Sequence, residues 1–142
     1  MIDEAAREEI ARQFAAAPFH AFLGLQFAVD DGHVRVSMPF REELVSNPAV
    51  PYLHGGVIGA LLDIAGDYAV AIELGRGVPT IDMRVDYLRV AGRESLTGTA
   101  TIVKLGRSVA VADAEVRSEK GELVAVGRIL YSTREPAARA TP

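Results

Sequence analysis

Two acids inside a long apolar segment are the side chains of this sequence best suited to chemistry. The segment runs from His54 to Leu74 and contains Asp63 and Asp67. A carboxylate taken out of water is costly unless it is paired or serves a purpose. Such a group can act as a general base or attack as a nucleophile. Because its neighbours are apolar, we expect burial to raise the pKa of Asp63 and make it a stronger base. We interpret Asp67, one helical turn further on, as a structural acid.

Two glycines stand at the start of the same segment. Gly55 and Gly56 follow His54 directly. If the segment is a helix, its first N–H groups have no partner within the helix and lie at the positive end of its dipole. Glycine also lets another group approach the backbone closely. The pair therefore predicts a place where a backbone N–H can hold an oxygen atom.

The apolar segment must itself be a helix that is buried on most sides. It is too long for a strand and suits roughly five to six helical turns. Its apolar residues occur almost all the way round the helix axis rather than on one stripe. Gly75, Gly77 and Pro79 then end it.

The elements on either side predict what encloses this helix. Upstream, a first helix runs from a cap at Asp3 to about Ala17, a short apolar turn follows at 19–24, and Asp31-Gly32 joins the strands of a hairpin. Residues 39–53 read as a loop. Downstream, the alternation of apolar residues predicts four strands at 80–90, 96–105, 108–117 and 122–133, with a slip at Leu88 and Val90 that indicates a bulge.

These elements predict an α+β fold, in which one antiparallel sheet wraps round and completely buries the long central helix at about 54–74, with an additional N-terminal helix. Small residues on one face of the third predicted strand, Ala110, Ala112 and Ala114, would let the helix lie close to the sheet. The last strand is apolar on both faces, which indicates a covered outer face and a tetramer. We interpret 1–142 as a single domain, with an N-terminal helical segment at 1–22 and a flexible tail at 134–142.

Composition and charge exclude several classes of protein. The 142 residues include no cysteine, which rules out disulfides, thiolate zinc sites and cysteine nucleophiles. The net charge is −4 and basic residues do not cluster, so we expect neither a nucleic-acid partner nor a membrane surface. The three histidines are not spaced as metal ligands. The charged N-terminus is unlike a signal peptide, and we expect a cytoplasmic protein.

A set of motifs carries a resemblance to a known family. Asn47-Pro48 is followed by Leu53-His54-Gly55-Gly56-Val57 and Leu62-Asp63, and then by Thr80-Ile81-Asp82-Met83-x-Val85-x-Tyr87. Over about residues 23–133 the chain resembles the hotdog-fold acyl-CoA thioesterases of the PaaI-like group, which relate to the phenylacetyl-CoA and 4-hydroxybenzoyl-CoA thioesterases. The His-Gly-Gly with an Asp nine residues after the His is the most specific part. In that family a long helix lies inside an antiparallel sheet, as expected above.

The resemblance implies that the chain hydrolyses acyl-CoA thioesters to a free acid and coenzyme A, with no cofactor. It places the catalytic carboxylate, as general base or nucleophile, on Asp63. It places the N–H that polarises the thioester carbonyl on Gly55, and we expect Gly56 beside it at the substrate. It also implies that the Asn47 amide assists, and that Thr80 and the carbonyl of His54 hold the attacking water.

The spacing of two of these residues adds a constraint. Gly55 and Asp63 are eight residues apart, which is roughly 12 Å along one helix. A single thioester carbonyl cannot bond Gly55 and be attacked from Asp63 of the same helix. We therefore expect a homodimer with antiparallel central helices and active sites at the interface, and a dimer of dimers beyond it.

Three basic residues near strand ends are candidates to bind the phosphates of coenzyme A, namely Arg89, Lys104 and Arg107. Two other functions remain open. A hotdog hydratase or dehydratase would act on acyl thioesters, but one such pattern has an Asp where this chain has Ala49, and another has Glu in place of Asp63. A non-catalytic acyl-CoA-binding protein would keep the pocket but lack the carboxylate.

Overall fold

The structure is a computed structural model that describes residues 4–137. It opens with two helices, α1 (Glu4–Ala16) and α2 (Pro18–Leu23). Pro18 stands in the first turn of α2, where its missing N–H costs nothing, and Gly24 ends this helix at a φ of 68°. The turn expected at 19–24 is therefore a short helix. Asp3, the expected cap of the first helix, lies outside the described residues.

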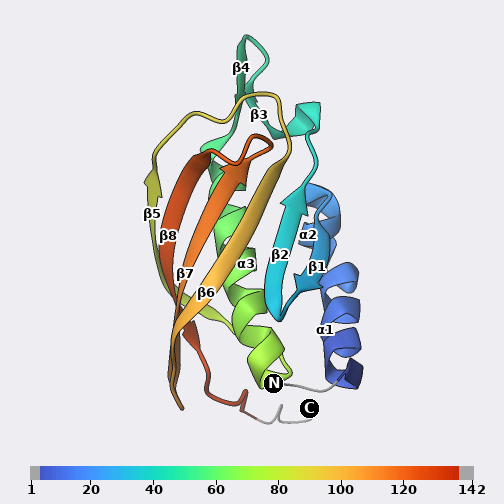
Figure 1. Ribbon diagram of the computed structural model, residues 1–142, viewed down its shortest axis with the longest axis vertical. Coiled ribbons are helices and arrows are strands. Elements are labelled where there is room, and N and C mark those ends of the chain that lie inside the picture. Colours follow the sequence, from blue (N-terminus) through green and yellow to red (C-terminus); the bar gives the residue numbers. More distant parts are fainter. Residues whose placement is uncertain (1–3, 138–142) are drawn as a thin grey trace.

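One antiparallel sheet of six strands forms the body of the molecule (Figure 1). Its order is β1-β2-β6-β7-β8-β5, so β1 and β5 are the two edges. The strands are β1 (Gln26–Asp30), β2 (His33–Met38), β5 (Thr80–Tyr87), β6 (Leu96–Leu105), β7 (Val109–Ser118) and β8 (Leu123–Ser132). The hairpin at Asp31-Gly32 and the turns at Gly106-Arg107 and Lys120-Gly121 lie where the sequence predicts them.

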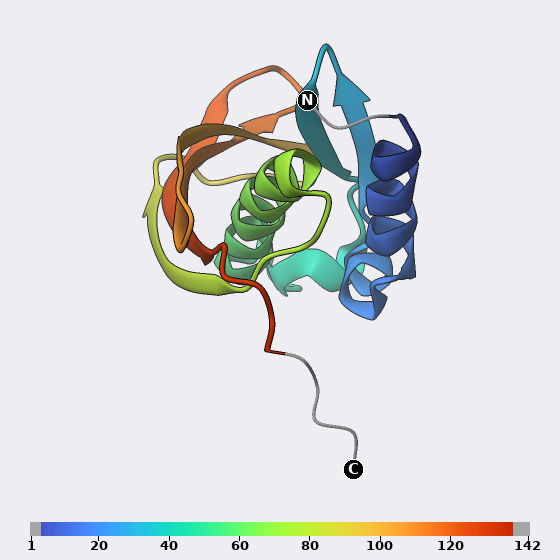
Figure 2. The ribbon, with the colours of Figure 1, turned by 90° about the horizontal axis from the view of Figure 1, so that it is seen from below.

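The central helix α3 (Gly55–Leu74) runs across the concave face of this sheet. Figure 2 shows the sheet curling round it, with α1 beyond the β1 edge. The alanines 110, 112 and 114 of β7 are buried, as expected. Phe14 anchors α1, because its ring contacts the rings of Tyr68 in α3 and Phe27 in β1, with centroids 4.8 and 4.9 Å away. The predicted helix-in-sheet architecture is confirmed.

The expectation that one sheet buries the helix completely is wrong. Twelve residues of α3 are buried, but Gly56, Ala60, Asp63 and Asp67 keep part of their surface open. These positions are three or four residues apart, so they form one stripe along the helix. The stripe contains Asp63 and Asp67, so both carboxylates are partly accessible in the single chain.

Two other segments can be compared with the sequence-based expectations. The segment 39–53 is not a plain loop, because it contains the 3-10 turn η1 (Glu42–Leu44) and a hairpin of β3 (Val45–Asn47) and β4 (Val50–Leu53). The expected slip lies just past the end of β5 at Tyr87, where the N–H groups of Leu88 and Arg89 both donate to the carbonyl of Val124, at 2.9 and 3.1 Å, as in a β-bulge. A further register shift, which the sequence did not predict, lies between Thr80 and Asp82.

The outer face of the last strand is less apolar than the sequence indicates. Val124 is fully buried, next to a register shift between β7 and β8 at Val116/Arg117. Arg128 lies exposed on the outside and forms a two-fold hydrogen-bonded ion pair with Asp113 of β7, at 2.7 Å for each bond. The outer face is therefore mixed in character, and its predicted role in a tetramer stays a prediction.

Within residues 4–137, none of the helices is long and apolar enough to cross a membrane.

Candidate active site

Asp63 and Thr80 meet where α3 passes the start of β5. The Thr80 hydroxyl donates a hydrogen bond of 2.8 Å to Oδ1 of Asp63. A carboxylate has a second oxygen and a hydroxyl has lone pairs, so both groups can still bind a water molecule. The two residues are 17 positions apart in the sequence, and the fold brings them together as the site prediction requires.

Tyr131 of β8 fixes the helix behind Asp63. Its hydroxyl donates 2.7 Å to the backbone carbonyl of Asp63, and the side chain is fully buried. Gly66 makes room for it, because a Cβ there would lie 2.2 Å from the Tyr131 hydroxyl. Burial, and then the nearby Asp63 and Asp67, raise the pKa of Tyr131, so it stays protonated and remains a donor.

Asp67 connects α3 to the loop that precedes β5. Its Oδ1 accepts the N–H of Val78 at 3.1 Å. Desolvation raises the pKa of Asp67 to about 6, the Val78 N–H opposes that rise, and the charge of Asp63 adds to it. The strongly perturbed carboxyl of the helix is thus the one interpreted from sequence as structural.

The N-terminus of α3 is capped by His54. Its Nδ1 accepts the N–H of Gly56 at 2.8 Å, and its carbonyl accepts the N–H of Val57 at 3.2 Å. In neutral His54 the proton therefore sits on Nε2. Gly56 is thus engaged by its neighbour, whereas Gly55, as the first residue of the helix, has no intrahelical acceptor for its N–H. The oxygen-binding role predicted for this turn fits Gly55, and the Gly56 N–H is not free to share it.

An apolar groove adjoins Gly55. It has a volume of about 320 Å³ and is lined by Tyr52, Leu53, Gly55, Ile58, Tyr87, Leu88, Arg89, Val90 and Ala91. Tyr87 forms one wall, and its hydroxyl donates 2.8 Å to the carbonyl of Gly55. A Cβ at Gly55 or Gly59 would lie 3.4 or 3.3 Å from Tyr87 atoms, so the missing side chains let the ring sit against the helix.

A larger hollow of about 650 Å³ lies elsewhere, between strands β5 to β8. Its lining includes the ion pair of Arg128 and Asp113 but none of the residues singled out above. Its walls are strands without a helix terminus or an unpaired acid. We therefore place the candidate site at the smaller groove and the Asp63–Thr80 pair.

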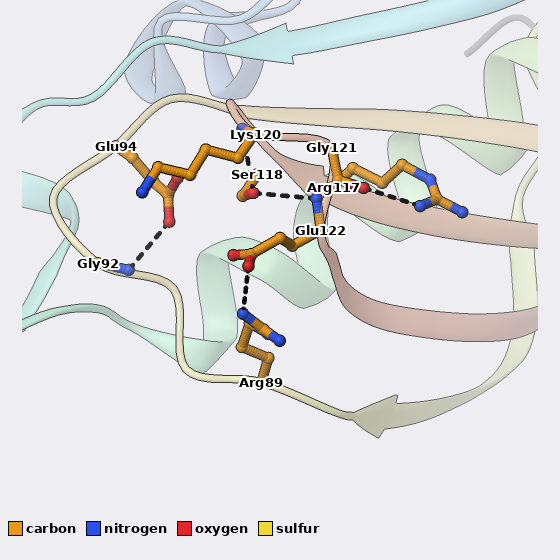
Figure 3. A network of polar contacts seen from close by, with 8 residues as sticks. All are labelled: Arg89, Gly92, Glu94, Arg117, Ser118, Lys120, Gly121 and Glu122. Carbon is orange, nitrogen blue, oxygen red and sulfur yellow. Dashed lines mark hydrogen bonds and ion pairs between the residues drawn. The ribbon is translucent and has the colours of Figure 1, made fainter.

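Two of the predicted site residues, Asn47 and Arg89, make contacts with residues close to them in the fold. The Asn47 side chain accepts the N–H of Ala49 at 2.9 Å, which closes the turn of the β3–β4 hairpin. This hairpin projects beyond the sheet at the end where α3 begins (Figure 1). Arg89 forms an ion pair of 2.7 Å with Glu122 at the β7–β8 turn, and Figure 3 shows this pair beside the turn that Ser118 organises.

The three predicted phosphate-binding residues do not form one cluster in the chain. Arg89 lies near Gly55, since both line the apolar groove. Lys104 and Arg107 lie at the β6–β7 hairpin, where Gly106 accepts the hydroxyl of Thr133. Because Thr133 also bonds Arg76, just after α3, this hairpin belongs to the other end of the helix. Among residues 4–137, no group of three or more His, Asp or Glu side chains is placed to hold a metal ion.

The candidate residues thus form two separate groups along β5. Asp63 contacts Thr80 at the start of the strand, and Gly55 contacts Tyr87 at its end. Seven strand positions span roughly 23 Å. One chain alone therefore does not bring Asp63 and the Gly55 N–H onto one carbonyl group.

A long helix inside a curled antiparallel sheet is the hotdog fold, and here the open side of the helix presents an acid and the N–H of Gly55. The sequence pattern of the thioesterase superfamily matches residues 51–125. The medium/long-chain acyl-CoA thioesterase YigI of Escherichia coli is 32% identical over 130 residues, which cover 80% of this chain and 84% of that protein. The chain belongs to the thioesterase superfamily and is a thioesterase.

Solved structures agree with this assignment. One protein from the thioesterase superfamily superimposes with a TM-score of 0.86 at 39% identity, covering 92% of this chain and all of that one. The PaaI protein of the Escherichia coli phenylacetic acid degradation operon shares the fold, with a TM-score of 0.79 at 22% identity over 96% and 97% of the two chains.

Sequence reasoning missed the roles of Tyr87 and Tyr131. Both are aromatic residues near strand ends, which ordinarily indicate core packing. The available signal was a pairing of each tyrosine with helix glycines, Gly55 and Gly59 for Tyr87 and Gly66 for Tyr131. That pairing depends on which strand crosses which turn of α3, and the sequence does not state it.

Proposed function

We propose that this thioesterase hydrolyses acyl-CoA thioesters in a site shared by two copies of the chain. The observation that carries the proposal is the Thr80–Asp63 hydrogen bond, because it presents an oriented carboxylate on the open stripe of α3. The name of the YigI relative and the apolar groove beside Gly55 support an acyl-CoA substrate.

The edge strand β5 supports pairing of two chains. It is exposed along nearly its whole length, including Ile81, Met83 and Tyr87. Within the described chain it pairs only with β8, so its other edge presents unpaired N–H and C=O groups. A long apolar edge strand of this kind is a template for pairing with another strand. We therefore assign the dimer interface to β5 and the adjoining stripe of α3.

A two-fold axis at the middle of β5 brings the separated groups together. Two antiparallel β5 strands centred between Met83 and Arg84 place Thr80 of one chain opposite Tyr87 of the other. Directly opposed residues lie on the same face with Cα atoms roughly 4.5–5.5 Å apart. Thr80 and Tyr87 both contact α3 in their own chain. Asp63 of one chain and Gly55 of its partner would then flank one substrate.

The chemistry follows from these two groups. The Gly55 N–H donates to the thioester carbonyl oxygen and stabilises the negative charge that develops there. Asp63 either takes a proton from a water held by the Thr80 hydroxyl, or itself attacks the carbonyl carbon. In the first route the carbon–sulfur bond then breaks, and coenzyme A leaves as the thiol with the proton that Asp63 had taken. In the second route coenzyme A leaves as the thiolate, and water then hydrolyses the mixed anhydride, which releases the acid and restores the Asp63 carboxylate. Asn47 and the His54 carbonyl remain proposed helpers, and Arg89, Lys104 and Arg107 remain proposed phosphate ligands.

Release of free thiol from a panel of short, medium, long and aromatic acyl-CoAs tests the proposal. We expect the Asp63→Ala and Asp63→Asn variants to lose about 100- to 10,000-fold in kcat. Asp30→Asn is the matched control, since Asp30 pairs with Arg35 on the β1–β2 hairpin. Undiminished release in both Asp63 variants, or tight binding of acyl-CoA without thiol release by the wild type, would overturn the proposal.

A further inference from the structure

We propose that Asp67 is a positioning residue for the Asp63–Thr80 pair and acts through the backbone N–H of Val78. The inference rests on the proposed role of Asp63 and goes beyond it. Asp67 touches no reacting atom in this scheme. Its carboxylate holds the loop that delivers Thr80 to Asp63.

A short series of contacts connects Asp67 to Asp63. Asp67 Oδ1 accepts the Val78 N–H at 3.1 Å, and the Val78 side chain is buried. Thr80 stands two residues further on and donates to Asp63 at 2.8 Å. Asp67 and Asp63 are one helical turn apart, so the loop is attached to the same stripe of α3 at both points.

The loop depends on this attachment because the strand it enters is irregular at Thr80. The register between β5 and β8 shifts between Thr80 and Asp82. On the β8 side the loop is held by the Ser132 N–H, which donates 2.8 Å to the carbonyl of Pro79. On the α3 side it is held by Asp67. Removing the Asp67 acceptor would leave the buried Val78 N–H unsatisfied and free the loop to move away from the helix.

The surroundings of Asp67 make its negative charge costly in the folded protein. Burial raises its pKa to about 6, and the charge of Asp63 adds to that effect. With this pKa the side chain is still mostly ionised at pH 7, but its charge costs more in the folded protein than it does in water. Tyr68 and Tyr131 also face this carboxylate, and its charge helps to raise the pKa of both hydroxyls. The proposed role needs only an oxygen that accepts the Val78 N–H, so a neutral Asn should fill it without this cost.

A double-mutant cycle on kcat/KM tests the inference. The Asp67→Ala variant removes the acceptor, whereas Asp67→Asn keeps an oxygen for the Val78 N–H. We expect Thr80→Ala to lose about 10- to 100-fold and Asp67→Ala about 10-fold, from hydrogen bonds to charged groups. We expect Asp67→Asn to recover most of the activity that Asp67→Ala loses, and Asp67→Ala/Thr80→Ala to resemble Thr80→Ala alone. Asp30→Asn serves again as the control.

Amide hydrogen exchange gives a readout that does not depend on activity. The Val78 N–H should exchange faster in Asp67→Ala and remain protected in Asp67→Asn. Losses that multiply in the double variant, or an unchanged Val78 exchange rate in Asp67→Ala, would refute the inference while leaving the proposed function intact. Full activity in Asp63→Asn and Thr80→Ala would instead refute the proposed function, and with it any positioning role.

Discussion

Mixing two inactive variants tests directly whether the active site is shared between chains. Asp63→Asn removes the proposed base, and Gly55→Pro removes the proposed oxyanion donor. Proline suits this position because Gly55 is the first residue of α3. The preceding His54 already has the extended backbone that proline requires, with φ −67° and ψ 133°. A Cβ at Gly55 would lie 3.4 Å from the Tyr87 ring, a close contact that a small shift of the exposed tyrosine relieves.

The size of the effect follows from the symmetry of the dimer. Loss of one oxyanion donor costs about 100- to 1,000-fold in kcat, so each variant alone should be nearly inactive. In a heterodimer of the two, one site carries both defects. The other site combines Gly55 of the Asp63→Asn chain with Asp63 of the Gly55→Pro chain, and it is intact. A purified heterodimer should therefore show about half of wild-type activity, and an equal random mixture about a quarter.

The assay uses two affinity tags, joint refolding of the two variants and tandem purification of the heterodimer, followed by thiol release from the best acyl-CoA. Wild type refolded with Asp63→Asn controls for losses during refolding. A heterodimer as inactive as its parents, in a preparation whose control regains activity, would refute the shared site and place Gly55 and Asp63 of one chain in separate roles.

Three further predictions concern the groups behind Asp63. Gly66→Ala should destabilise the protein by about 2 kcal/mol in chemical denaturation, since the new Cβ meets the buried Tyr131 hydroxyl at 2.2 Å; an equal cost in the Tyr131→Phe background would contradict this. Tyr131→Phe alone should cost about 1 kcal/mol, the net value of its hydrogen bond to the Asp63 carbonyl, and a neutral effect would count against that bond. Asp67→Asn should change the pH dependence of stability. Because the pKa of Asp67 is raised from 3.8 to about 6, the folded chain binds its proton more tightly, and stability falls as pH rises through this window. Because Asn does not ionise, the variant should keep up to about 3 kcal/mol of unfolding free energy that the wild type loses by pH 7. Identical dependence of stability on pH in wild type and variant between pH 4 and 7 would refute the assignment.

Much of the fold could be predicted from local patterns in the sequence. The length of the apolar segment required a helix, and alternation with glycine turns at 32, 106 and 121 defined the strands. The segment at 39–53 was harder, because two prolines and an Asn-Pro pair indicate a loop. The hairpin there depends on the Asn47 side chain closing its own turn and on Leu53 and His54 donating to Ala91 and Leu44.

Part of the candidate site could likewise be predicted from the sequence, and part could not. Residue type marked Asp63 and Gly55 as candidates, and the resemblance to the hotdog thioesterases gave them their predicted roles in preference to Asp67 and Gly56. The sequence also required them to be roughly 12 Å apart, since helix rise is fixed. Without that resemblance it could not separate Gly55 from Gly56, because that depends on the rotamer of His54, whose Nδ1 takes the Gly56 N–H.

Tertiary structure alone decided the contacts between distant parts of the chain. Thr80 reaches Asp63, Tyr87 covers Gly55 and Tyr131 fills the space at Gly66 because β5 and β8 cross particular turns of α3. Such contacts arise from strand order and register, which follow from the packing of the whole sheet and not from neighbours in sequence. The raised pKa of Asp67 has the same origin, since burial is a property of the folded chain. The sequence alone thus determined which groups are available, and the fold determined which of them meet.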